Sequence, residues 1–322
     1  MQRFEVVLSV VAVLLAAAAA GTRAESGASG KIRAVVSILP QGYFVERIGG
    51  ARVDVEVLAR PGQSPHTFEP TPAQMGKVAR AQIYFAIGGM PFETRLLEKV
   101  TATNKQMLVV DTRKGVPLRT MTADEAGFEE AQKHAAQGEH HQEPAGQPDP
   151  HFWLSPRLAK VLAANVCDGL KALDPPHAAE YEANLKKLQD DLDAVDAKLA
   201  AALAPLRGRA FFVYHPAFGY FADAYGLRQL PVEIEGKSPS AKELAALIQR
   251  ARKEGVKVIF VQPQLSPKSA RAIATAIGGV VVPMDDLAPD YIHNLEDMAG
   301  KIEEVLGGDK AAASRAGPDA RR

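Results

Sequence analysis

Short runs of β-branched and apolar residues alternate with helical patterns along most of this chain, in two series of four. Strands of this kind, separated by helices with polar faces, are typical of parallel sheets covered by helices on both sides. The sequence therefore predicts an α/β fold with two lobes, each built on a four-stranded parallel sheet. The strand segments are IRAVVSI, VDVEVLA, AQIYFAI and QMLVVDT in the first series, and RAFFVYH, RQLPVEI, VKVIFVQ and GGVVVPM in the second.

A long amphipathic helix is expected between the two series, over residues 176–206. Its apolar residues recur every three or four positions, which places them on one helix face. A coiled-coil dimer helix is the alternative, but it would need three or more clean heptads with charged flanks. We expect one stiff helix that packs along both lobes of a monomer and limits closing motion. The apolar positions are Tyr181, Leu185, Leu188, Leu192, Val195, Leu199 and Leu203.

The expected lobes span residues 32–175 and 207–307, and residues 308–322 are expected to form a flexible tail. Residues 1–24 have the layout of a secretory signal peptide, with Arg3 before an apolar run and small residues after it. A transmembrane helix is the alternative, but the apolar run is shorter than the ~20 residues of a comfortable span. No cysteine stands near the cleavage point to carry a lipid, so we expect a free periplasmic protein.

The charge balance and the cysteine content of the chain exclude several kinds of partner and cross-link. The chain has 38 basic and 38 acidic residues, a balance that argues against nucleic acid or an anionic membrane as a partner. Its one cysteine, Cys167, cannot form an internal disulfide, and its apolar helical surroundings predict a buried structural thiol.

Four residues capable of binding a metal follow predicted strands or lie in loops. His66 comes after VDVEVLA through the turn PGQSP, and His151 lies between a polar loop and the next helix. His215 ends the strand FFVYH, and Asp285 follows GGVVVPM. In open α/β sheets, ligands bind beyond the carboxyl ends of the strands. Three imidazoles and one carboxylate suit a divalent first-row metal, so these residues predict one metal site between the lobes.

Several motifs occur in the order seen in a known family: PGQSPHTFEPTP, DPHFWLSP, YHPAFGYFADAYGL, KSPSAKEL and VIFVQPQLSPKSARAIA. From about Val35 to Leu306, the chain resembles the cluster A-I metal-binding solute receptors of ABC transporters, and among them the periplasmic zinc-uptake receptors of ZnuA type. The resemblance implies a metal between two α/β lobes joined by a long helix, and a membrane permease as partner. It also implies the ligands His66, His151, His215 and Asp285, with Asp286 as the alternative for the fourth position.

The chain departs from the family pattern in two places. Ser64 stands where the common turn has aspartate, which leaves the support of His66 unidentified. The polar loop over residues 125–147 is shorter than the histidine-rich loops of many zinc receptors. Its histidines, His134, His140 and His141, either gather metal or are incidental members of a solvated loop.

Nitrogen donors dominate the expected site, which favours Zn²⁺, with Mn²⁺ or Fe²⁺ as the alternative. The main competing function is a secreted zinc hydrolase, which needs an open coordination position and a general base. The sequence contains no H-E-x-x-H motif, and four ligands would fill a tetrahedron, so we expect a binding protein and no enzyme. A metal-sealed adhesin is a third possibility.

Four further residues receive structural interpretations. Trp153 is expected to pack at the cleft entrance or the lobe interface, and His293 to lie exposed on a helix. Glu233 and Glu235 flank a strand end; surface solvation is expected for them, with support of a metal ligand as the alternative.

Overall fold

The computed structural model describes residues 30–122, 125, 148–233 and 240–315. The chain divides between Lys31 and Ile32, and all elements described below belong to the unit that starts at Ile32. The expected signal peptide, the three loop histidines and Glu235 lie outside the described residues. Within the described ranges, no helix combines the length and apolar character that a membrane span requires.

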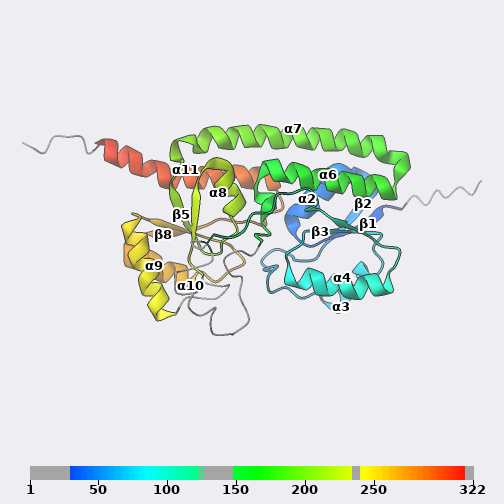
Figure 1. Cartoon of the computed structure of the whole chain (residues 1–322), viewed down its shortest axis with the longest axis horizontal. Coiled ribbons are helices and arrows are strands. Elements are labelled where there is room, and N and C mark those ends of the chain that lie inside the picture. Colours follow the sequence, from blue (N-terminus) through cyan, green and yellow to red (C-terminus); the bar gives the residue numbers. More distant parts are fainter. Residues whose placement is uncertain (1–29, 123–124, 126–147, 234–239, 316–322) are drawn as a thin grey trace, which may run out of the picture. The chain divides into compact units, whose positions relative to one another are not determined.

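Two four-stranded parallel sheets form the framework, as predicted. Their strand orders are β2-β1-β3-β4 and β6-β5-β7-β8, so the two sheets have the same topology (Figure 1). The first contains β1 (Ile32–Val36), β2 (Val53–Val57), β3 (Ile83–Ala86) and β4 (Leu108–Asp111). The second contains β5 (Ala210–Val213), β6 (Arg228–Pro231), β7 (Val258–Val261) and β8 (Val280–Pro283).

Helices cover both sheets. In the first lobe, α2 and α6 lie on one face of the sheet, and α3 and α4 lie on the other (Figure 1). At Gly169, α6 approaches its sheet so closely that an added Cβ would lie 2.8 Å from Val110 Cγ2. The bounds are α2 (Leu39–Gly49), α3 (Pro72–Val78), α4 (Pro91–Thr103) and α6 (Pro156–Leu173) in the first lobe. In the second they are α8 (Gly219–Tyr225), α9 (Ala241–Lys253), α10 (Lys268–Ile277) and α11 (Tyr291–Arg315). Helix α11 continues to Arg315 and so extends into residues 308–322, where the sequence predicted a flexible tail.

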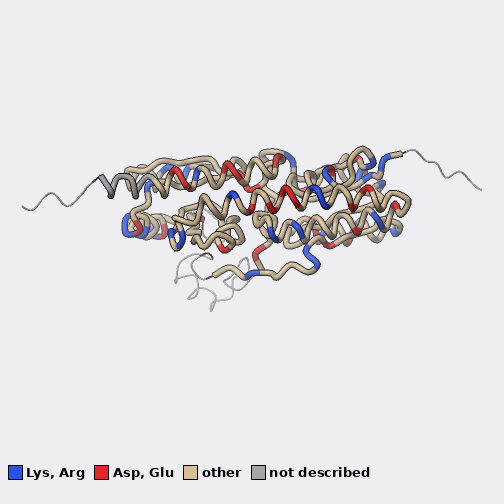
Figure 2. The backbone as a smooth tube through the Cα atoms, turned by 90° about the horizontal axis from the view of Figure 1, so that it is seen from above, with Lys and Arg blue, Asp and Glu red and all other residues tan. Residues whose placement is uncertain are grey.

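The predicted linking helix is present as α7 (Ala178–Leu203), between the 3₁₀ turns Pro175–His177 and Ala204–Leu206. It packs against α2 and α6 of the first lobe and against α8 and α11 of the second. Its apolar stripe is buried, while charged residues of both signs occur along the helix when it is viewed from above (Figure 2).

One hydrophobic core runs through both lobes because α7 joins them. It contains the strands of the first sheet, the buried stripe of α7, and Phe211, Val213 and Phe260 of the second sheet. A second, smaller cluster fills the space between the second sheet and helices α9 and α10. The larger cluster therefore belongs to both lobes, and the smaller one belongs to the second lobe alone.

The shared core yields a prediction for Leu188, which is fully buried in the middle of α7. Leu188→Ala should lower the free energy of unfolding by about 2–5 kcal/mol, because it leaves a cavity where the helix meets the core. Lys187→Ala, one residue away on the exposed face, should change it by less than about 0.5 kcal/mol. Urea denaturation followed by circular dichroism measures both. Equal stabilities for the two variants would contradict this account of α7.

Candidate metal centre

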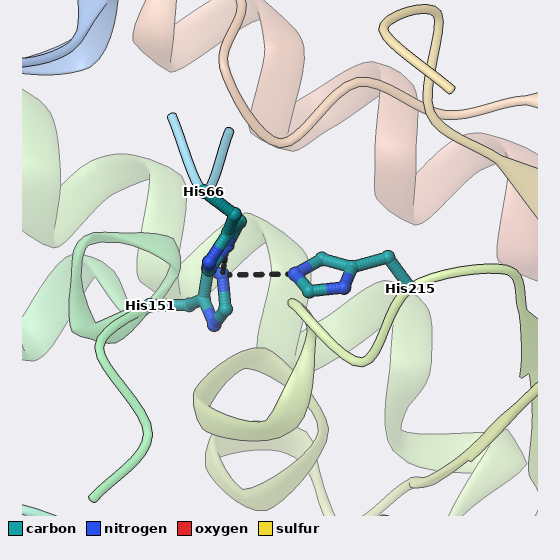
Figure 3. A group of neighbouring side chains, drawn as sticks. All are labelled: His66, His151 and His215. Atoms are coloured by element: carbon teal, nitrogen blue, oxygen red, sulfur yellow. Dashed lines mark hydrogen bonds between the residues drawn. The ribbon is translucent and has the colours of Figure 1, made fainter. Parts of the chain in front are cut away.

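Three histidines from separate turns meet at the carboxyl ends of the strands. His66 lies in the turn after β2, His151 immediately precedes the 3₁₀ turn Phe152–Leu154, and His215 follows β5. Each offers a ring nitrogen within 4.8 Å of the others. Among the described residues, they are the one such group of three or more potential metal ligands. Figure 3 shows the rings of His66 and His151 facing that of His215.

The Nε2 atoms of the three rings converge. His151 Nε2 lies 3.3 Å from His66 Nε2 and 3.3 Å from His215 Nε2. A tetrahedral zinc centre with Zn–N bonds of about 2.0–2.1 Å places its ligand nitrogens about 3.3–3.4 Å apart. Both distances therefore match edges of a zinc tetrahedron, with His151 Nε2 at the shared corner.

The buried carboxylate of Asp149 orients His151. Asp149 Oδ1 lies 2.8 Å from His151 Nδ1 and also accepts the backbone N–H of His151 at 2.9 Å. Burial alone would raise the pKa of Asp149, but its hydrogen bonds with His151 and Arg119 outweigh burial and lower it. An ionised carboxylate at Nδ1 favours the tautomer that carries its proton there, which leaves the Nε2 lone pair free to bind a metal.

Glu233 plays the same part for His215. Its carboxylate is hydrogen-bonded to His215 Nδ1, and the residue is only 7% exposed. The expectation that Glu233 is a solvated surface residue was wrong, because the end of β6 turns it inward beside β5. Gln262 holds the backbone of His215 from the other side, donating to its carbonyl at 3.1 Å.

His66 differs from the other two histidines. No carboxylate is hydrogen-bonded to its ring in the described part of the chain, in line with the serine at position 64. Burial lowers the pKa of His66 well below the ordinary value of 6.5, and the neighbouring His215 and His151 lower it further. The folded protein therefore favours the neutral form of this imidazole, which is the form that binds metals.

The fourth predicted ligand lies in the turn after β8, where two aspartates follow each other. Asp285 Oδ1 accepts hydrogen bonds from Gln264 Nε2 at 2.7 Å and from the backbone N–H of Leu287 at 2.9 Å. These bonds give Asp285 a structural part in shaping the turn. The metal-ligand group that the structure brings together contains neither aspartate.

Asp286 is buried, and its carboxyl lies near the histidines. Burial raises the pKa of this carboxyl, while the electrostatic effects of His151 and His215 act in the opposite direction. Trp153 Nε1 donates to the backbone carbonyl of Asp286 at 2.9 Å and so ties the turn to the first lobe. Asn294 holds the carbonyl of Asp285 at 2.7 Å.

Other residues also lie where the sequence placed them. Trp153 is fully buried between the lobes, and its ring centroid is 5.2 Å from that of His151. Cys167 is a free, buried thiol, and burial raises its pKa to about 11. His293 lies exposed on α11. Gln262 and Asp149 were missed as supports; the DPH motif was the available signal for Asp149.

Comparison with known proteins supports these observations. The chain matches the model of the family described as zinc-uptake complex component A, periplasmic (ZnuA), over residues 34–305. The zinc-binding protein AdcA of Streptococcus pyogenes is 30% identical over 303 residues, which cover 87% of this chain and 58% of AdcA. The high-affinity zinc uptake system protein ZnuA of Brucella abortus is 33% identical over 174 residues, covering 50% of this chain and 51% of that protein. The matched region thus spans just over half the length of these relatives.

Solved structures extend the likeness to three dimensions. A crystal structure of ZnuA aligns over 86% of this chain and 99% of that chain, with 38% identity and a TM-score of 0.76. A ZnuA deletion mutant with zinc bound aligns over 86% of this chain and 98% of that chain, with 38% identity and a TM-score of 0.75.

The lowered pKa of His66 predicts a pH dependence of stability in the chelator-treated protein. Below an ordinary value of 6.5, the unfolded chain binds a proton at His66 that the folded protein does not. Stability should therefore be greatest above this value and should fall as the pH drops below it. The melting temperature, measured by calorimetry between about pH 7.5 and 5, should decline less steeply for His66→Ala than for the wild type. The exposed His293→Ala should keep the wild-type slope, and a wild-type slope in His66→Ala would refute the assignment.

Proposed function

The chain belongs to the ZnuA family of periplasmic zinc-uptake components, and on this basis we propose that it is a metal receptor. In this proposal it captures Zn²⁺ between its two lobes and delivers the ion to the membrane permease of an ABC transporter for import. Residues 1–24 act as a cleaved signal peptide that directs it to the periplasm. Capture and delivery involve no chemical reaction, so the protein has no enzymatic role.

The observation that carries this proposal is the convergence of three Nε2 atoms from both lobes. His151 and His215 each bind a buried carboxylate through Nδ1, which supports a fixed tautomer with Nε2 directed inward. The ligand set is rich in nitrogen, which favours Zn²⁺ over Mn²⁺ or Fe²⁺. The zinc-binding names of the relatives point to the same metal.

For the fourth ligand, the physical environment favours Asp286 over Asp285. A buried carboxylate is costly unless a cation or hydrogen-bond donors compensate its charge. Among the described residues, no other residue donates a hydrogen bond to the Asp286 carboxylate, whereas Asp285 receives two such bonds. A zinc ion held by the three imidazoles would supply the charge that Asp286 lacks.

A secreted hydrolase is the competing function. It would need a metal-bound water and a general base beside it. Two buried carboxylates near the histidines, Asp149 and Glu233, are already bound to Nδ1 atoms and serve as orienting groups. With Asp286 as the fourth ligand, no coordination position is left for a water, which favours a receptor.

We expect metal-stripped protein to bind one equivalent of Zn²⁺. Trp153 is the single tryptophan of the chain and lies beside His151, so its fluorescence should change during a zinc titration and level off at one equivalent. His66→Ala, His151→Ala and His215→Ala should each weaken binding by more than the roughly 10–100-fold typical of losing an outer supporting group. His293→Ala should bind like the wild type. Unchanged affinity in all three variants would refute this site, and tighter binding of Mn²⁺ in competition would change the assigned metal.

The two aspartates can be separated by matched substitutions. Asp286→Asn should weaken zinc binding by about tenfold or more, because it removes a charged ligand and keeps the side-chain shape. Asp285→Asn should have a much smaller effect, because its amide oxygen can still accept the bonds from Gln264 and Leu287. Calorimetric zinc titrations measure both affinities. The opposite ranking would assign the fourth ligand to Asp285.

A further inference from the structure

A single arginine outside the histidine cluster joins three carboxylates. Arg119 follows β4 and is only 13% exposed. Its Nη1 donates to Asp149 Oδ2 at 2.8 Å, its Nε to Asp223 Oδ2 at 2.9 Å, and its Nη2 to both oxygens of Glu125 at 3.0 and 2.9 Å. Its guanidinium also lies over the ring of Tyr220, 5.7 Å from the centroid.

The hydrogen bond from Arg119 to Asp149 connects the arginine to His151. Asp149 uses its two oxygens for different partners: Oδ1 holds the ring and backbone of His151, and Oδ2 accepts from Arg119. Asp149 is fully buried, so its orientation depends on these few bonds. Arg119 therefore holds the carboxylate of Asp149 in place, and this carboxylate in turn orients the imidazole of His151.

The contacts of Arg119 with Glu125, Asp223 and Tyr220 connect it to the turn that carries His215. Glu125 Oε1 accepts from Gln229 Nε2 at 2.9 Å, and the same amide nitrogen lies 3.3 Å from the carbonyl oxygen of Pro216. Asp223 and Tyr220 belong to α8, the helix directly after this turn, and the Tyr220 hydroxyl accepts the backbone N–H of Arg119 at 2.9 Å.

Gly219, at the start of α8, makes room for this arrangement. A Cβ added there would lie 1.9 Å from Arg119 Nη1 and 2.7 Å from Asp149 Oδ2. Both atoms belong to the ion pair behind His151. The second lobe therefore presents a residue without a side chain at the point where the ion pair of the first lobe lies against it.

We propose that Arg119 is a positioning residue that aligns His151 of the first lobe with the His215 turn of the second, so that the imidazoles are placed before zinc arrives. This inference rests on the proposed zinc-receptor function. Metal-binding side chains that are already in position bind the ion more tightly, because less side-chain entropy is lost on binding. Arg119 does not touch the metal and acts through Asp149, Glu125 and α8.

The test compares Arg119→Gln with Arg157→Gln in the full mature chain. Arg157 is a matched control, because its Nε donates to Asp196 Oδ2 at 2.9 Å and its guanidinium lies 6.0 Å from the ring centroid of Tyr225. In the part of the chain that the structure describes, neither contact leads on to a histidine of the site. Zinc affinity is measured by competition with a chromophoric chelator, and folding by the melting temperature. Arg119→Gln should weaken zinc binding by about 10–100-fold, as loss of outer-sphere support does in other metal sites. Arg157→Gln should stay within about twofold.

The direction of the change separates positioning from charge. Removing a positive charge near the site would by itself strengthen the binding of a dication. Weaker binding therefore indicates loss of alignment. The visible spectrum of bound Co²⁺ should also change in Arg119→Gln, because it reports the coordination geometry, and it should not change in Arg157→Gln.

Gly219→Ala provides a second variant that keeps every charge. Its methyl group should push Arg119 away from Asp149 and weaken zinc binding in the same direction, even if Arg119→Gln fails to fold. If wild-type protein binds zinc and Arg119→Gln and Gly219→Ala bind it equally well with unchanged Co²⁺ spectra, Arg119 is not a positioning residue. If the wild type itself binds no zinc, the proposed function fails instead.

Discussion

Three imidazole nitrogens directed at one point have no attraction for one another, and the rest of the structure has to hold them there. Their lone pairs repel until a cation binds them, so the arrangement depends on contacts behind each ring. Asp149 and Glu233 supply these contacts by binding Nδ1 of His151 and His215. Those two hydrogen bonds favour the tautomers that carry the proton on Nδ1, and these tautomers leave each Nε2 lone pair free to bind a metal.

The hydrogen bonds from Asp149 and Glu233 can keep the three imidazoles at a fixed spacing only because both lobes belong to one packed body. Helix α7 contacts helices of both lobes, and one core continues from the first sheet through α7 into the second. Close-packed interiors transmit displacement instead of absorbing it. His66 and His151 on one side and His215 on the other therefore keep their spacing, and the network around Arg119 adds a polar connection along the same boundary.

The turn after β8 shows how neighbouring residues with the same side chain can acquire different roles. The carbonyls of Asp285 and Asp286 are held by Asn294 and Trp153, which fixes the direction of each side chain. One carboxylate then accepts hydrogen bonds within the turn, and the other is buried near the imidazoles. Among the described residues, no other residue donates a hydrogen bond to the buried carboxylate of Asp286, so a nearby cation stabilises its charge more than that of Asp285.

The sequence alone determined the two sheets, the linking helix and the three histidines. The strands are recognised as short runs of β-branched and apolar residues and the helices by a period of 3.6 residues. Parallel strands bring the residues after their carboxyl ends to one edge of the sheet. The supporting contacts had no such signal. His215 meets Glu233 across 18 positions and Arg119 meets Asp223 across 104, and in both cases the partner is an ordinary acidic residue in the sequence. Only tertiary packing decided that Glu233 is shielded from water and faces a histidine, and that Asp223 faces an arginine, because burial and distance depend on the whole fold.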